Sequence, residues 1–370
     1  MFDVVTIGSI TRDNFLEGDF VLEKWPKAPS GKALVLPFGE KLEITGVYST
    51  IGGNSANAGV TFARQGFKTA CFGKVGDDLS GKEIFGRLKK EGVKPLLAAS
   101  KEKPTAYSVL LLKNAERTIL GYHGASDTMQ MKDIPWNSLK AGWWYLSLAG
   151  ESDKFLKPLL NFAKKNNIKV AFNPSGYHIK HKRKEILDSL KDLAFLVLNR
   201  GEAEDLVGMS FSAGGGSTFG GKRKKEVFKK LDRMTPGIVA VTDGPNGVMV
   251  SDGKSLYKAG IFKEKKIVDR TGAGDAFGSG FVAGLMRFSD RSDKADKSDK
   301  SNKSDNFNGS GKPDSLNNIY SPEAIKYAIR LASANATSVV ESIGATEGIL
   351  TKKQFQSARW KNFKISVQKL

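Results

Sequence analysis

Residues 269–280 place a glycine-rich turn between a strand-like run and an apolar, helix-like run. Gly272, Ala273 and Gly274 form the turn, and such small residues allow several backbone N–H groups to converge on one point. The start of the following helix adds the positive end of its dipole, which favours an anion. Asp275 stands beside the turn, where a carboxylate can accept a proton next to bound phosphate. The pattern predicts phosphoryl transfer to a hydroxyl, with an ordinary helix cap as the alternative.

A second glycine-rich turn, at Gly52 and Gly53, opens another helix-like segment. Asn54 and Asn57 project amides from its first turn, and an amide can donate and accept hydrogen bonds, as recognition of a polyol requires. Capping of the helix by these asparagines is the alternative. Asp13 follows the first strand-like run, and a carboxylate at a strand end can accept hydrogen bonds from two sugar hydroxyls. These residues are therefore candidates for an acceptor site.

Two more turns follow strand-like runs and suit a nucleotide. Asn199 and Glu202 lie three residues apart at a helix start, where they can hold phosphate and a hydrated Mg²⁺, with Glu202 acting through water. The same pair also fits a capping box, and one role does not exclude the other. Thr242, Gly244 and Gly247 either line a nucleotide or form a simple hairpin turn. The sequence contains no Walker A loop, so a phosphate-transferring enzyme of this kind uses another framework.

Strand-like and amphipathic helix-like segments alternate along most of the chain. The expected strands are 3–8, 69–74, 143–148, 168–172, 194–198, 237–242 and 247–250. The expected helices are 54–66, 80–91, 152–166, 183–191, 201–207, 223–233, 275–287 and 322–340. This rhythm predicts an α/β fold with a mostly parallel sheet that is covered on both faces. Ligands of such sheets bind beyond the carboxyl ends of the strands, where the candidate residues lie.

Four segments break this rhythm. Residues 14–50 and 105–121 alternate in polarity without a helix pattern, which predicts antiparallel strands of a small lid, or ordinary edge hairpins. Residues 211–222 read as a flexible Gly/Ser loop. Residues 288–320 contain a Ser-Asp-Lys repeat with almost no apolar side chains, which predicts a disordered insertion rather than a domain boundary. The chain is therefore expected to form one domain, 1–370.

Composition limits the class of protein. The chain has 370 residues, 40% of them hydrophobic and 26% charged, which is typical of a soluble globular protein. Its single cysteine, Cys71, and three histidines suit neither a disulfide framework nor a typical zinc site. A signal-peptide pattern and membrane-length apolar runs are lacking, so we expect a cytoplasmic protein. The formal charge of +19 comes from scattered lysines without an aromatic stripe, so specific nucleic-acid binding is not expected.

Taken in order along nearly the whole chain, these motifs resemble the ribokinase-like carbohydrate kinases, also called the PfkB family. The segment from Asp269 to Asp275 is similar to the family's most specific signature. The resemblance implies a ribokinase-like three-layer sandwich with a mostly parallel central sheet and a small β-stranded lid, which often forms a dimer surface. It also implies that ATP and Mg²⁺ are used, and that a sugar or nucleoside hydroxyl accepts the phosphate.

The resemblance assigns a role to each candidate residue. Asp275 matches the catalytic base, and Gly272, Ala273 and Gly274 match the anion hole. The residues that match the acceptor site are Asp13, Gly53, Asn54 and Asn57, with Gly52 beside them. The Mg²⁺–phosphate motif corresponds to Asn199 and Glu202, and the nucleotide-lining turn to Thr242, Gly244 and Gly247. Many members bind a monovalent cation such as K⁺, to which Asp269, Thr271 and the turn around Gly344 would contribute here.

The sequence leaves the acceptor open. A sugar is the first expectation, and a nucleoside such as adenosine is the alternative within the kinase interpretation. The lid residues Lys113, Arg117 and Tyr122 either meet an acidic acceptor or are simply solvated. Arg270 departs from the family, which often has a small hydroxyl residue there, and it either contacts phosphate or reshapes the cation site. A non-catalytic regulator on the same scaffold is a third interpretation, against which the intact Asp275 argues.

Overall fold

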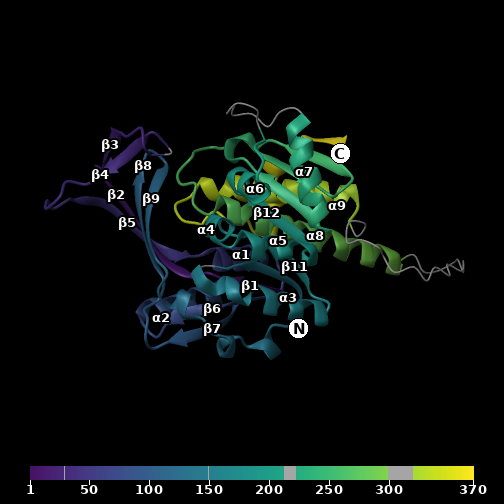
Figure 1. The fold of residues 1–370 in the computed structure, drawn as a ribbon, viewed down its shortest axis with the longest axis horizontal. Helices are drawn as coiled ribbons and strands as arrows, with labels where there is room; N and C mark the ends of the chain where they lie inside the picture. Colours follow the sequence, from purple (N-terminus) through teal and green to yellow (C-terminus); the bar gives the residue numbers. More distant parts are fainter. Residues whose placement is uncertain (29, 149, 212–221, 299–319) are drawn as a thin grey trace, which may run out of the picture.

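A computed structural model of the chain describes residues 1–28, 30–148, 150–211, 222–298 and 320–370. Its main body is built on a sheet with strand order β16-β15-β14-β13-β12-β11-β10-β1-β6-β7 (Figure 1). The strands are β1 (Phe2–Gly8), β6 (Thr69–Gly76), β7 (Lys94–Ser100), β10 (Ala141–Ser147), β11 (Lys169–Phe172), β12 (Phe195–Asn199), β13 (Ile238–Thr242), β14 (Val248–Ser251), β15 (Ser255–Ala259) and β16 (Ile365–Lys369). Strands β7 to β13 in this order run parallel, and β14 to β16 are antiparallel.

Helices cover both faces of this sheet. One face packs against α3 (Leu156–Lys165), α4 (Gly176–His181), α5 (Arg183–Ser189), α6 (Arg200–Val207) and α7 (Lys222–Met234). The other face packs against α1 (Asn54–Arg64), α8 (Ala273–Ser298) and α9 (Pro322–Val340). Two further helices, α2 (Leu79–Lys90) and the short α10 (Lys352–Phe355), lie at the edges of this body.

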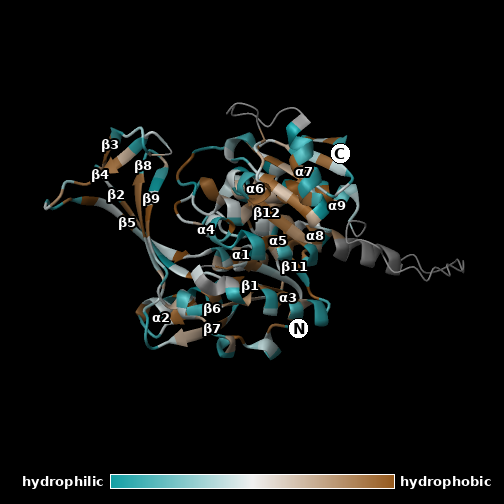
Figure 2. Ribbon diagram, viewed as in Figure 1, coloured by the Kyte–Doolittle hydropathy of each residue, from teal (hydrophilic) through white to brown (hydrophobic). Residues whose placement is uncertain are grey.

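Strand β12 shows why the layers form. Leu196 and Leu198 point into one core, whereas Phe195 and Val197 point into the other, as the two-residue period of a strand requires. The Phe195 ring stacks on that of Phe281 in α8, with centroids 4.6 Å apart. Such continuous apolar strands, brown in Figure 2, are typical of a parallel sheet buried on both faces. The predicted three-layer α/β fold is confirmed.

Most predicted segments match elements to within a few residues. The helix expected at 152–166 begins only at Leu156, because Gly150–Phe155 form a 3-10 helix. The sequence interpretation missed β7, β15, β16 and the short α4. Helix α8 continues through Ser298, so residues 288–298 of the predicted insertion are helical. Residues 299–319 of that insertion, and 212–221 of the predicted Gly/Ser loop, lie outside the described residues.

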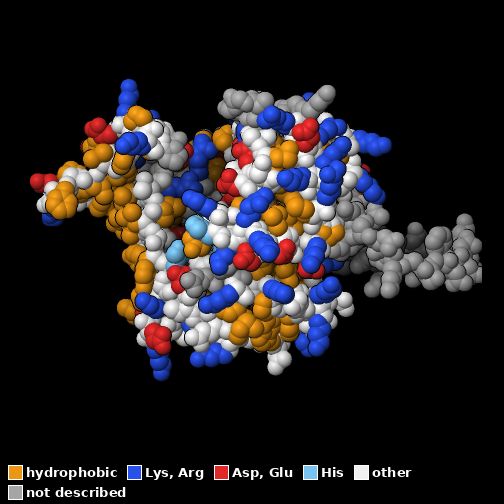
Figure 3. Space-filling model, in the orientation of Figure 1, with side chains coloured by type: hydrophobic (Ala, Val, Ile, Leu, Met, Phe, Trp, Pro, Cys, Tyr) orange, Lys and Arg blue, Asp and Glu red, His pale blue; other side chains and the backbone are white. Residues whose placement is uncertain are grey.

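A small sheet forms a lid beside the main body (Figure 1). Its strand order is β5-β2-β8-β9, and β3 and β4 pair separately. The strands are β2 (Thr11–Gly18), β3 (Val21–Lys24), β4 (Lys32–Val35), β5 (Ile44–Gly52), β8 (Tyr107–Lys113) and β9 (Glu116–Tyr122). Asn114 and Ala115 both have positive φ, 55° and 60°, so the β8–β9 connection is a tight hairpin turn. Figure 3 shows hydrophobic side chains along the outer side of this lid.

In the part of the chain that the structure describes, the helices are too short or too polar to serve as membrane spans.

Candidate active site

A cavity of about 610 Å³ lies between the lid and the carboxyl ends of the central strands. Seven of the predicted site residues line it: Asp13, Gly53, Asn54, Asn57, Thr271, Gly272 and Asp275. They come from β2, from the start of α1 and from the start of α8, which are far apart in the chain. The fold therefore brings the predicted acceptor residues and the predicted base into one cavity.

Two glycines, Gly52 and Gly53, let the chain pack closely around Asp13 in this cavity. A Cβ atom on Gly52 would overlap the Asp13 carboxylate, and one on Gly53, whose φ is +88°, would overlap the backbone of Ser9. Thr11 Oγ1 donates a hydrogen bond of 2.6 Å to Asp13 Oδ1. The two glycines are therefore required by close approach and, at Gly53, by backbone conformation.

The first turn of α1 links the acceptor side to Asp275. Asn57 Nδ2 donates to Asp275 Oδ2 at 2.9 Å. Asn57 Oδ1 is buried and has no hydrogen-bond partner among the described residues. Since a buried acceptor without a donor is costly, this oxygen favours a ligand that brings a hydroxyl. Asn54 is held differently, because its Nδ2 donates to Ser147 Oγ at 3.0 Å.

Burial controls the electrostatics of the cavity. It raises the pKa of Asp275 from 3.8 to about 6, because burial disfavours the carboxylate and the charge of Asp13 adds to this effect, although Asn57 opposes it. Burial also raises the pKa of Asp13, against the hydrogen bonds from Thr11 and Ser108. A carboxylate with a pKa near 6 is ionised at neutral pH yet basic enough to take a proton from a hydroxyl.

The predicted anion hole lies at the start of α8. Gly272 has φ +78°, and a Cβ atom there would overlap Ala345, so this turn depends on glycine. Gly272 O accepts a hydrogen bond from Ala276 N at 2.8 Å, which begins the helical ladder. A Cβ atom on Gly274 would meet no atom within 4 Å, so the backbone there is open to a ligand. Ala273 N donates to Arg270 O at 3.5 Å, and the other first N–H groups of the helix have no carbonyl partner within it, so they are candidates to bind an anion.

A second, largely apolar cavity of about 200 Å³ lies on the other side of this turn. Thr242, Gly244 and Gly247 line it, together with Ala273 and Gly274. The turn 272–274 therefore separates the two cavities, with Gly272 facing the first and the next two residues facing the second. An anion bound at this turn would lie next to both cavities.

Asn199 and Glu202 do not line either cavity and form the capping box that the sequence allowed. Glu202 N donates to Asn199 Oδ1 at 2.9 Å, and Asn199 N donates to Glu202 Oε2 at 2.8 Å. Burial raises the pKa of Glu202, and the charge of Asp275 adds to this effect. A desolvated carboxylate near a second carboxylate fits a nearby cation such as hydrated Mg²⁺.

Asp269 joins the signature segment 269–275 to the turn at Gly344. Its Oδ1 accepts from Thr271 N and Oγ1 at 2.9 and 2.7 Å, and its Oδ2 accepts from Gly344 N at 3.2 Å. The carboxylate is therefore satisfied by protein donors, which gives Asp269 a structural role without a cation. The predicted monovalent-cation site depends on the family resemblance.

The lid contributes charged and aromatic groups. Arg117 and Tyr122 line the first cavity, whereas Lys113 pairs with Asp19 at 3.1 Å and does not line it. Arg270 lines the second cavity and pairs with Glu116 of the lid, 3.3 Å from Nε to Oε1. The tip of the lid thus contacts the signature segment itself.

Several cavity residues were missed by the sequence interpretation. Ser9, Ser108, His123 and Tyr177 line the first cavity, and Ser333 and Thr337 line the second. Only Ser9 carried a usable signal, since it follows directly after the first strand. His123 directly follows the lid strand β9, and the others lie on a lid strand or on helices, where a polar residue is usually solvated.

Comparisons with known proteins find relatives of this chain in sequence and in structure. Residues 30–352 match the family described as pfkB family carbohydrate kinase. Adenosine kinase of Saccharomyces cerevisiae is 27% identical, covering 77% of this chain and 85% of the relative. Ribokinase of Lactococcus lactis is 26% identical, covering 77% and 84%. A solved structure, Arabidopsis thaliana ribokinase complexed with ribose and ATP, superposes with a TM-score of 0.70 at 20% identity, covering 98% and 99%.

Replacing Asp275 by Asn should stabilise the protein at alkaline pH. The folded-state pKa of about 6 lies above the ordinary value of 3.8, so wild-type stability falls as pH rises through this window. At pH 8 we expect Asp275→Asn to be more stable by about 2–3 kcal/mol, because one pKa unit corresponds to about 1.4 kcal/mol. The gain should vanish near pH 4. Urea unfolding at both pH values measures the difference in stability.

Asp78→Asn is the control. Hydrogen bonds from Thr105 and Gly81 lower the pKa of Asp78, so the loss of its carboxylate should destabilise the protein. Equal stability of Asp275→Asn and wild type at pH 8 would contradict a folded-state pKa of about 6 for Asp275.

Gly52→Ala should destabilise the cavity wall. The new methyl group would overlap the Asp13 carboxylate, and such overpacking costs about 1–3 kcal/mol. Chemical denaturation measures the free energy of unfolding. Gly86→Ala on α2 is the matched control, since a methyl group there meets no atom within 4 Å. If both variants unfold like the wild type, Gly52 does not pack on Asp13 as described.

Proposed function

Because this chain belongs to the pfkB family of carbohydrate kinases, we propose that it transfers the γ-phosphoryl group of ATP to a hydroxyl of a sugar or sugar-like acceptor. One observation carries the proposal: the turn 272–274 separates two cavities, and Asp275 lies at its side in the first. The first cavity takes the acceptor and the second takes the nucleotide. The match to a ribokinase described as complexed with ribose and ATP supports this choice of ligands.

In the proposed reaction, Asp13, Asn54 and Asn57 hold the acceptor hydroxyls. Asp275 accepts the proton of the reacting hydroxyl as its oxygen bonds to the γ-phosphorus. The bond from that phosphorus to the bridging oxygen breaks, and ADP leaves. The backbone N–H groups of 272–274 stabilise the charge that develops on the transferred group.

The lid closes over the acceptor and limits the access of water, which would otherwise compete as the nucleophile. Arg117 and Tyr122 form the lid side of the cavity, and Glu116 pairs with Arg270 beside the nucleotide side. Arg270 thus stands where it can meet both the lid and a nucleotide phosphate.

Asn199 and Glu202 would hold Mg²⁺ through water. The ion would supply positive charge that screens the phosphate oxygens of the nucleotide. A monovalent cation such as K⁺ would lie near Asp269 and Thr271, as proposed from the family resemblance alone.

The acceptor is proposed to be a sugar, and a nucleoside is the second candidate. Tyr122 and Tyr177 line the acceptor cavity, together with Leu110, Ile119 and Leu148, and these side chains could stack against a base. The match to an adenosine kinase supports the same alternative. A non-catalytic regulator is less favoured, since the base, the anion turn and both cavities coexist in this chain.

The lid is also proposed to pair with a second copy of this chain. Its exposed apolar side chains include Val21, Leu22, Trp25, Val47, Ile119 and Leu120. Such a gathering of apolar side chains on a soluble domain marks an interaction surface. We propose a cytoplasmic location, for which the single buried Cys71 is the supporting feature.

Asp275→Asn should abolish most turnover. We expect kcat to fall by roughly 10²–10⁴ with small changes in KM, as is typical when a general base is removed. In wild type, kcat/KM should rise with pH through about 6 and then level off, because only ionised Asp275 can accept the proton. A coupled ADP assay with ATP, Mg²⁺ and a panel of sugars, sugar phosphates and nucleosides measures both effects and identifies the acceptor. Asp188→Asn on the surface of α5 is the control. Near-normal turnover of Asp275→Asn would remove the proposed mechanism.

Val47→Glu should weaken a dimer formed through the lid. Val47 is 64% exposed on β5, and a buried, unpaired carboxylate would disfavour the interface. Sedimentation velocity should show a dimer for wild type and a shift toward monomer for the variant. Leu79→Glu is the matched control, since Leu79 is 83% exposed on α2, outside the lid. A monomeric wild type would refute the dimer.

A further inference from the structure

The segment 341–350, which connects α9 to α10, supports the anion turn from behind. Ala345 is fully buried and packs against Gly272 so closely that a Cβ atom on that glycine would overlap it. One residue earlier, Gly344 N donates to Asp269 Oδ2 at 3.2 Å. Because Asp269 also accepts from Thr271 N, a shift of this segment would disturb the turn at its first residue, Gly272, and at the residue before it.

The same segment contacts the lid. Ile343 packs against an apolar cluster made of Phe15, Leu110 and Leu112, which belong to lid strands β2 and β8. Thr50 Oγ1 of strand β5 donates to Glu347 Oε1 at 3.3 Å. The segment 341–350 therefore lies between the lid and the anion turn, and packs on both.

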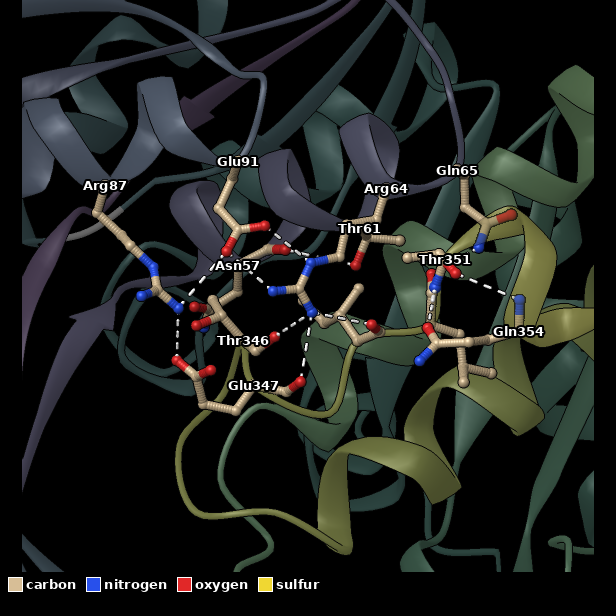
Figure 4. Close-up of polar contacts among 12 residues, drawn as sticks. Asn57, Thr61, Arg64, Gln65, Arg87, Glu91, Thr346, Glu347, Thr351 and Gln354 are labelled. Carbon is tan, nitrogen blue, oxygen red and sulfur yellow. Dashed lines mark hydrogen bonds and ion pairs between the residues drawn. The ribbon is translucent and has the colours of Figure 1, made fainter.

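Arg64 and Gln65, at the end of the helix that carries the acceptor residues, both hold this segment (Figure 4). Gln65 Nε2 donates to Leu350 O at 2.8 Å, and Arg64 makes the larger set of contacts. Arg64, the last residue of α1, donates through Nη1 to Thr346 O at 2.8 Å, to Ile349 O at 2.9 Å and to Glu347 O at 3.3 Å. Three backbone carbonyls of an irregular segment thus share one guanidinium. A lysine could not reproduce this, because an ammonium lacks the planar, fixed donor set.

The rest of the guanidinium is fixed by Glu91. Arg64 Nε and Nη2 donate to the two carboxylate oxygens of Glu91 at 2.8 and 2.9 Å, which is the bidentate geometry. The two side chains are 17% and 13% exposed, so this pair is largely desolvated. Arg87 of α2 joins Glu91 to Glu347, at 3.5 and 2.7 Å. Removing Arg64 would leave a buried carboxylate and three carbonyls without this donor, which is costly.

We propose that Arg64 is a positioning residue for phosphoryl transfer: by clamping the segment 341–350 it fixes the anion turn relative to the acceptor residues on α1 and to the lid. The proposal rests on the function proposed above. Arg64 lines neither the acceptor nor the nucleotide cavity, so it acts through Ala345 and Gly344 rather than on a ligand.

A positioning role predicts a specific kinetic pattern. The N–H groups of the anion turn act mainly on charge that develops in the transition state, so their displacement lowers kcat more than it raises KM. A misplacement of about 1 Å can cost roughly 100-fold in rate. We therefore expect Arg64→Ala to lower kcat by roughly 10- to 100-fold. KM for ATP and for the acceptor should each stay within about threefold of wild type, since uniform binding is retained. Arg64→Lys should recover only part of the loss.

The control is Arg183→Ala. Like Arg64, Arg183 donates to backbone carbonyls: its Nε binds Asp205 O and Leu206 O at 3.2 and 3.0 Å. Like Arg64, it lines neither cavity. Amide hydrogen exchange provides a second readout that does not require turnover. In Arg64→Ala, peptides covering 342–349 and 271–276 should both exchange faster than in wild type, whereas peptides from α7 should not change. If Arg64→Ala fails to fold, Arg64→Lys and Glu91→Gln carry both measurements.

The outcomes separate this proposal from the proposed function. If wild type turns over no acceptor on the panel, the kinase proposal fails, and hydrogen exchange still decides whether Arg64 fixes the anion turn. If exchange rises at 342–349 but not at 271–276, Arg64 is only a local structural residue. A kcat within twofold of wild type, or a loss confined to KM, overturns the positioning role. So does a loss of equal size in Arg183→Ala.

Discussion

The site depends on keeping two ionisable carboxylates, Asp13 and Asp275, out of water in one cavity. Each is less than one tenth exposed, and burial raises the pKa of both. The charge of Asp13 adds to the rise at Asp275, and the charge of Asp269 adds to the rise at Asp13. The molecule offsets this cost with short donors from Thr11 and Asn57 and with the positive start of α8 beside Asp275. These donors only partly restore the ordinary pKa of Asp275, and this residual destabilisation of the charged form gives Asp275 its basicity. The burial that destabilises the ionised carboxylates therefore also gives Asp275 the raised pKa that the proposed proton transfer needs.

Backbone geometry follows from that constraint. The buried Asp13 carboxylate packs directly on the backbone of Gly52, where a methyl group would overlap it. At Gly272 a methyl group would overlap Ala345. The positive φ of Gly272 turns the chain into α8, so that N–H groups face the boundary between the two cavities. Asn57 links the two halves, because it lies on the acceptor helix and donates to the base. The proposed acceptor site and the proposed anion turn are thus linked by a hydrogen bond rather than being merely neighbouring sites.

Much of this could be predicted from the sequence, for an identifiable reason. In a parallel sheet the polar residues that follow each strand gather at one edge, which placed Asp13, just beyond β1, at this edge. The strand-like run expected before the signature segment, 266–268, forms no strand, and Asn54 follows the lid strand β5. Asn54 and Asp275 were therefore placed correctly by their glycine-rich turns rather than by the strand pattern. The glycines were informative because glycines close together before a helix usually mark a turn that needs close approach or a positive φ. The Asn199–Glu202 pair was predicted with two roles, and the structure contains the capping box, while the metal role stays a prediction. Strand β7 was missed because Lys94–Ser100 lacks the β-branched residues that favour strands.

The parts that sequence could not predict depend on contacts between distant segments. Nothing in the spacing of Arg64 and Thr346 connects them, yet they form a hydrogen bond of 2.8 Å across 282 positions. Arg270 shows the same limit, since its departure from the family pattern is explained only by Glu116, which the β8–β9 hairpin brings to 3.3 Å. An arginine at this position places positive charge on the nucleotide side of the anion turn and also gives the lid a partner there. An exposed ion pair of this kind contributes about 0–1 kcal/mol, which is too little to hold the lid closed. The Arg270–Glu116 contact therefore costs little to break, whereas the bidentate and largely buried Arg64–Glu91 pair is costly to break.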